Sequence, residues 1–91
     1  MSHQPVFSII TVTYNAERWL ERTILSVLSQ SYTNVEYLII DGGSKDRTVE
    51  IIRQYASGLA YWVSEPDKGL YDAMNKGLRQ ATGDYLVFLN A

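Results

Sequence analysis

Four short apolar runs alternate along the chain with three stretches in which apolar residues recur at helical spacing. The runs at 6–12, 37–41, 59–63 and 84–90 are rich in β-branched and large apolar residues, a pattern typical of strands. Between them, apolar residues recur every three or four positions, which predicts amphipathic helices, the first of about four turns. Their expected buried positions are Leu20, Ile24, Val27 and Leu28 in the first, Val49, Ile52, Tyr55 and Ala56 in the second, and Leu70, Met74, Leu78 and Ala81 in the third.

Capping residues predict where these helices begin and end. Asn15 and Ser44 are placed to cap the first two helices, because their side-chain oxygens can accept a hydrogen bond from a free amide of the first turn. Gly58 and Gly83 are placed to end the second and third helices.

The resulting order, β-α-β-α-β-α-β, predicts an α/β fold. Helices that connect successive strands imply right-handed crossovers and a four-stranded parallel sheet with helices on both faces. The 91 residues contain no internal repeat and no linker, so we expect a single domain over 1–91.

Composition and charge argue against several classes of function. The formal net charge is −2 and the basic residues are scattered, whereas a protein that binds nucleic acid usually carries a basic patch. No apolar run approaches the roughly 18 residues of a membrane span. The absence of cysteine fits a reducing compartment. We therefore expect a cytoplasmic protein without nucleic-acid partners and without a membrane span.

The second predicted strand ends on Asp41, which is followed by Gly42, Gly43 and Ser44. Ligands of open parallel sheets usually bind at the carboxyl ends of the strands, so Asp41 is a candidate site residue. An aspartate before glycines also commonly accepts hydrogen bonds from its own turn. The local sequence leaves both roles open.

Polar residues follow the other predicted strands as well, and a parallel sheet would bring all of these ends to one rim. A rim of this kind can bind a ligand, or it can be polar only because strand ends meet water. Lys68 could meet a phosphate at the start of the third helix, or Asp67-Lys68-Gly69 could be a solvated turn. The rim residues besides Asp41 are Thr13 and Asn15, then Glu65, Asp67 and Lys68, and finally Asn90.

Several segments, in this order and at this spacing, resemble the amino-terminal half of family 2 glycosyltransferases, and two of them resemble the branch that builds bacterial surface polysaccharides. That branch is indicated by 64–69 (SEPDKG) and 71–75 (YDAMN). The other segments are 7–15 (FSIITVTYN), 26–32 (SVLSQSY), 40–46 (IDGGSKD), 75–77 (NKG) and 81–85 (ATGDY).

The resemblance implies a GT-A fold, in which a Rossmann-like half-domain with strand order 3-2-1-4 binds a nucleoside diphosphate sugar, usually a UDP-sugar. It implies that Thr13, Tyr14 and Asn15 line the base pocket and that Asp41 contacts the nucleoside. Mn²⁺ or Mg²⁺ would be held by aspartates that the family places just after Ala91. The catalytic base would follow later, so we expect no catalytic and no metal-binding residue within 1–91.

Two positions depart from the family pattern. Many members carry proline where this chain has Val12, a change that we expect to alter only backbone stiffness. Many also carry two consecutive acids after the second strand, whereas the second position here is Gly42. If the second acid is the one that meets the base, Asp41 only supports its turn.

The expected function is therefore transfer of a sugar from a nucleoside diphosphate sugar to a saccharide or lipid-linked saccharide acceptor, with inversion at the anomeric carbon. By itself, 1–91 would be a truncated and inactive nucleotide-sugar-binding portion. One alternative is a Rossmann-like module that binds a nucleotide without chemistry. Another is a domain that self-associates, because with strand order 3-2-1-4 the fourth strand, around 86–89, forms an exposed apolar edge.

Overall fold

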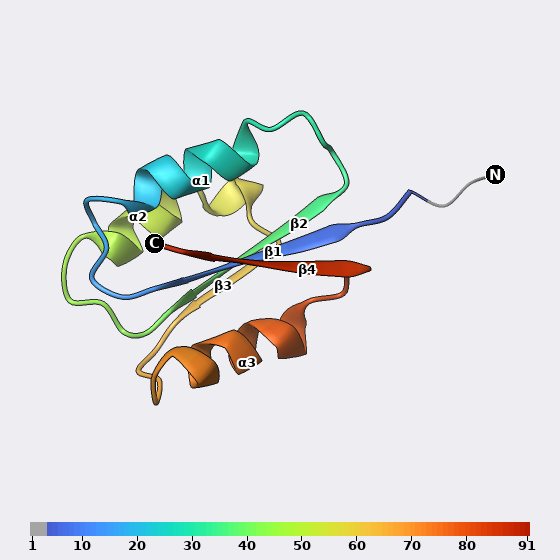
Figure 1. The fold of residues 1–91 in the computed structure, drawn as a ribbon. Helices are drawn as coiled ribbons and strands as arrows, with labels where there is room; N and C mark the ends of the chain where they lie inside the picture. The colour runs from blue at the N-terminus through green and yellow to red at the C-terminus, as the bar shows by residue number, and fades with distance from the viewer. Residues whose placement is uncertain (1–3) are drawn as a thin grey trace.

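The computed structural model describes residues 4–91 and confirms the predicted α/β architecture (Figure 1). Its sheet contains four parallel strands in the order β3-β2-β1-β4. Along the chain the elements are β1 (Phe7–Thr13), α1 (Leu20–Leu28), β2 (Val35–Asp41), α2 (Thr48–Gln54), a 3₁₀ turn (Ala56–Gly58), β3 (Tyr61–Ser64), α3 (Leu70–Gln80) and β4 (Tyr85–Asn90).

The sheet separates two apolar clusters, because successive residues of a strand point to opposite faces. On one face, Ile9 of β1 packs with residues of α1 and α2. On the other face, its neighbour Ile10 packs with α3. Figure 1 shows α1 and α2 on one side of the sheet and α3 on the other. Residues 38–40 of β2 are fully buried, as a strand covered on both faces requires.

The strands end level with one another at the carboxyl edge of the sheet. Thr13 of β1 lies opposite Asp41 of β2, and Asp41 in turn lies opposite Ser64 of β3. On the other side of β1, Val12 lies opposite Asn90 of β4. The four strand ends therefore form one continuous rim.

The first two helices begin later than predicted, and the predicted caps are wrong. Helix α1 has nine residues, fewer than four turns, and α2 starts at Thr48. Asn15 has a left-handed backbone (φ 47°) and, like Ser44, hydrogen-bonds to another loop instead of to a helix amide. The N-cap of α2 is Arg47, which makes no side-chain cap hydrogen bond, while Oδ1 of the preceding Asp46 accepts the amide of Thr48 at 2.9 Å.

Helix α3 packs through small residues instead of the predicted leucines. Leu70 and Leu78 are 51% and 40% exposed, whereas Ala73 and Gly77 are buried. A Cβ on Gly77 would lie 2.6 Å from Ile10 Cγ2, so the missing side chain allows the helix to approach β1. Of the four predicted positions, Met74 and Ala81 do pack on this cluster. In α1, Leu28 is likewise 40% exposed, contrary to expectation.

None of the helices in the described range 4–91 is long and apolar enough to span a bilayer.

Candidate functional site

A pocket of about 380 Å³ lies at the carboxyl rim of the sheet, where β1 and β4 end beside the start of α3. Its walls come from three segments that are far apart in the sequence, as the strand order requires. These are the end of β1, the loop and first turn of α3, and the end of the chain. The lining residues are Val12, Thr13, Tyr14, Asp67, Gly69, Leu70, Ala73, Asn90 and Ala91.

Four of the seven predicted site residues line this pocket. Tyr14, at 57% exposed, presents its ring beside the end of β1, and Asn90 is exposed at the end of β4. Thr13 and Asp67 complete the set. Thr13 Oγ1 has no hydrogen-bond partner, the one buried side-chain nitrogen or oxygen of 4–91 in this condition. A buried hydroxyl without a partner is unfavourable, so a ligand or water that reaches it would gain a hydrogen bond.

Asp41 lies at the same rim but does not line the pocket. Its side chain is fully buried, and its carboxylate accepts four hydrogen bonds. Three come from the turn that follows β2, from the amides of Gly43 and Ser44 and from the Ser44 hydroxyl. The fourth comes from the hydroxyl of Ser64, at the end of β3, at 2.7 Å. Asp41 therefore holds the ends of β2 and β3 together.

Asn15 connects the loop after β1 to the loop after β2. Its backbone amide donates to the hydroxyl of Ser44 at 2.7 Å, and its side-chain Oδ1 accepts a hydrogen bond from the backbone amide of Lys45 at 2.8 Å. Because Ser44 also donates to Asp41, these bonds join three strand ends into one hydrogen-bonded unit. Asn15 thus stabilises the rim that carries Tyr14.

Asp46 is a second carboxylate that ties the loop after β2 to the loop after β1. Its Oδ2 accepts the amide of Glu17 at 3.3 Å. Desolvation raises the pKa of Asp46, but hydrogen bonds from Thr48 and from the Glu17 amide outweigh it and hold the pKa below its ordinary value. The group therefore stays ionised at neutral pH.

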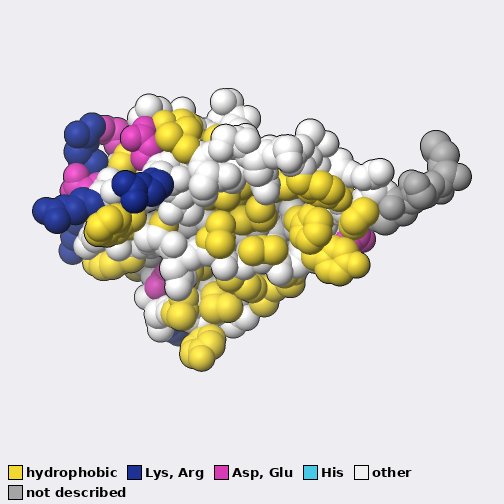
Figure 2. All heavy atoms as spheres, turned by 45° about the horizontal axis from the view of Figure 1, so that its top comes forward, with side chains coloured by type: hydrophobic (Ala, Val, Ile, Leu, Met, Phe, Trp, Pro, Cys, Tyr) yellow, Lys and Arg dark blue, Asp and Glu magenta, His cyan; other side chains and the backbone are white. Residues whose placement is uncertain are grey.

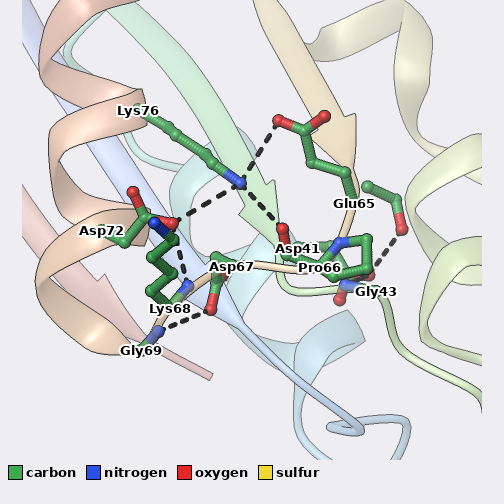
Figure 3. A network of polar contacts seen from close by, with 10 residues as sticks. Asp41, Gly43, Glu65, Pro66, Asp67, Lys68, Gly69, Asp72 and Lys76 are labelled. Carbon is green, nitrogen blue, oxygen red and sulfur yellow. Dashed lines mark hydrogen bonds and ion pairs between the residues drawn. The ribbon is translucent and has the colours of Figure 1, made fainter.

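Asp67 of the loop between β3 and α3 lines the pocket, and Figure 3 shows the polar contacts of this loop. Asp67 Oδ1 accepts the amide of Gly69 at 3.1 Å, and the amide of Lys68 donates to Asp72 of α3 at 2.9 Å. Gly69 has a positive φ of 113°, which glycine adopts without strain. Lys68 is exposed at the start of α3 but does not line the pocket.

Lys76 is a residue of this region that sequence reasoning missed. From α3 its Nζ lies 3.2 Å from Glu65, 3.9 Å from Asp72 and 3.3 Å from the carbonyl oxygen of Pro66 (Figure 3). The side chain is only 15% exposed. Lys76 therefore ties the loop that carries Asp67 to α3. A lysine in an amphipathic helix usually reaches solvent, and no pattern in the sequence placed Lys76 beside this loop.

The rim has basic groups close to it. Figure 2 shows Lys and Arg side chains, with Asp and Glu side chains among them, at the end of the molecule where the strands end. The loops after β2 and β3 contribute Lys45, Arg47 and Lys68, all exposed. Positive charge at the start of a helix favours the binding of phosphate groups.

The described residues do not offer a site for a metal ion. Within 4–91, no three His, Cys, Asp or Glu side chains are grouped so that they could hold one. The pocket itself presents an aromatic ring, a hydroxyl, an amide and a carboxylate, groups that can bind and orient a ligand by stacking and hydrogen bonding.

Comparisons with known proteins agree on the family. Over 92 aligned residues the chain is 46% identical to an uncharacterized glycosyltransferase of Mycobacterium tuberculosis, covering 100% of this chain and 35% of that protein. It is 39% identical to a PGL/p-HBAD biosynthesis glycosyltransferase of Mycobacterium bovis, covering 96% of this chain and 35% of the relative. The chain thus spans about a third of the length of these curated relatives.

Solved structures show the same fold. A mannosyltransferase from Pyrobaculum calidifontis, in complex with GDP-Man and Mn²⁺, matches with a TM-score of 0.87 and 29% identity, over 98% of this chain and 28% of that one. TarS of S. aureus (residues 1–349) in complex with UDP matches with a TM-score of 0.81 and 28% identity, over 93% and 27% of the two chains. A sequence profile described as "Glycosyl transferase family 2" matches residues 8–91, nearly the whole chain, and this chain therefore belongs to glycosyl transferase family 2.

Proposed function

We propose that residues 1–91 are the nucleotide-sugar-binding portion of an inverting glycosyltransferase that moves a sugar from a nucleoside diphosphate sugar to a polysaccharide or glycolipid acceptor. The observation that carries this proposal is the pocket at the carboxyl rim, which brings Thr13, Tyr14, Asp67 and Asn90 together. Two structural neighbours support it, because one is in complex with GDP-Man and the other with UDP. A relative named for PGL/p-HBAD biosynthesis supports a glycolipid acceptor.

Each predicted site residue has a role in this proposal. The exposed ring of Tyr14 stacks on the base, Thr13 forms part of the pocket wall, and Asn15 holds the loop that carries Tyr14. Asp67 and Asn90 make polar contacts, and the ammonium of Lys68, at the start of α3, attracts the diphosphate. Asp41, which is buried, positions the rim without touching the ligand.

The remaining chemistry belongs to other parts of the protein in this proposal. An acceptor hydroxyl, deprotonated by a base outside 4–91, attacks the anomeric carbon, and the nucleoside diphosphate leaves with the bonding electrons. A divalent metal such as Mn²⁺ or Mg²⁺, held by residues after Ala91, would stabilise the charge of the leaving group. Residues 1–91 contribute the binding and orientation of the donor, and we expect no sugar transfer from them alone.

The coding sequence beyond Ala91 tests this division of labour. A sequence that continues with aspartates suited to a metal, and then with a further domain, supports the glycosyltransferase. If the coding sequence instead stops at Ala91, a nucleotide-binding module without chemistry replaces the proposed enzyme.

The binding role is tested by calorimetric titration of the chain with UDP, GDP and UDP-sugars, with and without Mn²⁺. Replacing Tyr14→Ala should weaken nucleotide binding roughly tenfold or more, because stacking of a base on an aromatic ring contributes about 1–3 kcal/mol. Tyr71→Ala is the matched control, since Tyr71 is also an exposed tyrosine (80%) but lies outside the pocket. Absence of nucleotide binding to the wild-type chain, or equal losses in the two variants, would contradict the proposal.

A second candidate function is self-association through β4. This strand is an edge of the sheet, and three of its apolar side chains are exposed: Tyr85 (56%), Leu86 (47%) and Val87 (37%). Beside it, Val87 and Leu89 join Phe7 and Val35 in lining an apolar groove. Figure 2 shows hydrophobic side chains over much of the visible face. Unpaired strand edges of this kind favour pairing with another chain.

A further inference from the structure

We propose that Asp67 is the carboxylate that recognises the nucleoside, and that Gly42 is required because it leaves the space that this carboxylate occupies. Gly42, directly after β2, has no side chain. Asp67, from the loop before α3, supplies an acidic group at this place instead. This inference rests on the proposed function and goes beyond it, because it makes the pair Gly42 and Asp67 the determinant of nucleoside binding.

The space beside Gly42 is filled by the Asp67 carboxylate. A Cβ built on Gly42 would lie 2.8 Å from Asp67 Oδ2, 3.3 Å from Cγ and 3.4 Å from Oδ1. The backbone at this point is held by the hydrogen bond from the Gly42 amide to the carbonyl oxygen of Thr13, at 3.0 Å. A side chain at position 42 would therefore displace Asp67 instead of moving aside itself.

Backbone conformation does not explain the glycine. The positive-φ glycines of the described chain are Gly43 and Gly69, and Gly42 is not among them. An alanine at position 42 would thus meet no backbone strain, and its effect would come only through contact with Asp67. Gly42 and Asp67 are therefore expected to act as one unit.

One oxygen of Asp67 remains available for a ligand. Oδ1 accepts the amide of Gly69, whereas Oδ2 has no hydrogen-bond donor among residues 4–91. The side chain is half-buried in the pocket wall, and Lys76 holds the preceding residues by binding Glu65 and the carbonyl oxygen of Pro66. Oδ2 is thus a free acceptor in a held position.

The chemistry of a carboxylate indicates which part of the ligand it meets. An ionised carboxylate accepts hydrogen bonds from N–H and O–H groups and repels phosphate oxygens. The nucleoside offers such donors, in the ring N–H of uracil or guanine and in the ribose hydroxyls. Asp67 therefore faces the nucleoside, and the diphosphate lies farther from it.

A double-mutant cycle on the chain tests this inference, with binding of UDP and GDP measured by calorimetry. Asp67→Ala should weaken binding about 10- to 100-fold, as expected for a lost hydrogen bond to a charged group. Gly42→Ala should weaken binding by displacing the carboxylate. Gly42→Ala combined with Asp67→Ala should bind no worse than Asp67→Ala alone, because the space at position 42 then has no further role.

Two further variants and two modified nucleotides make the outcome decisive. Asp67→Asn keeps the shape of the side chain without its charge. It should also bind the nucleotide more weakly, and a loss in this variant would not be due to a change in the fold. Glu50→Gln, an exposed carboxylate on α2, is the charge-matched control and should bind like the wild type. Weaker binding of UDP methylated at N3 would assign the ring N–H as the donor to Asp67, and weaker binding of 2′-deoxy-UDP would assign the ribose.

The results separate this inference from the proposed function. If the wild type binds a nucleotide but Asp67→Ala and Asp67→Asn bind equally well, the inference is overturned and the proposed function stands. The inference is also overturned if the losses of binding free energy in Gly42→Ala and Asp67→Ala add up to the loss in the double variant. If the wild type binds neither UDP nor GDP, the proposed function fails and this inference with it.

Discussion

Asp41 is a buried carboxylate whose role is fixed by its partners. Local sequence allowed either a ligand contact or a turn, and its four hydrogen bonds favour the turn. A buried carboxylate stays stable only when donors surround it, and here they come from Gly43, Ser44 and Ser64. The rim of the pocket depends on this residue although the residue does not line it.

Replacing Asp41→Ala should therefore destabilise the fold by about 3 kcal/mol, because several donors lose their acceptor in a buried place. Urea unfolding followed by circular dichroism measures the change. Glu50→Gln should leave stability nearly unchanged, since its ion pair with Arg47 is exposed. If Asp41→Ala lowers the free energy of unfolding as little as the control does, the hydrogen bonds of Asp41 do not stabilise the fold.

Glu36 plays a similar part between elements at the other end of the sheet. From β2 it accepts hydrogen bonds from Ser8 of β1 at 2.6 Å, and from the amide and hydroxyl of Thr82 at 2.8 Å and 2.7 Å. Burial raises the pKa of Glu36, but these bonds outweigh it, so the pKa is lowered from 4.5. The carboxylate thus joins β1 and β2 to the turn before β4.

A lowered pKa makes this stabilisation depend on pH. The ionised form is favoured in the folded state, so its contribution is fully present above pH 4.5 and is lost as the pH falls through the lower folded pKa. Glu36→Gln should lower the midpoint of thermal unfolding at pH 7, and the gap to wild type should narrow below pH 4.5. A gap that is constant from pH 7 to pH 3 would argue against this role.

At the level of the whole molecule, the exposed edge of the sheet predicts association between copies. Val87→Lys on β4 should reduce it, because a charge on an edge strand opposes pairing with another chain. Light scattering over a concentration series measures the effect, and Leu25→Lys on α1, another exposed apolar position, is the control. A wild-type chain that stays monomeric at high concentration would refute the second candidate function.

The predictions that succeeded depend on patterns within single segments. The four strands, the three helices and their order follow from runs and periods in the sequence, and the resemblance added the strand order 3-2-1-4. The errors fall where distant segments meet. Asn15 and Ser44 have the side chains of caps, yet partners in other loops take their hydrogen bonds. Leu70 and Leu78 have helical spacing, yet the face of α3 that carries the small residues Ala73 and Gly77 packs against the sheet.

The sequence by itself determined the kind and order of the elements, the family, and the group of polar residues at the strand ends. These follow from local preference and from burial of apolar faces, which a linear pattern records. Only the tertiary structure decided that Asp41 is enclosed while Asp67 lines the pocket, that Gly42 leaves space for Asp67, and that Lys76 holds its loop. Such assignments depend on distances between residues far apart in the chain, and a side chain's role is set by the partners that folding brings to it.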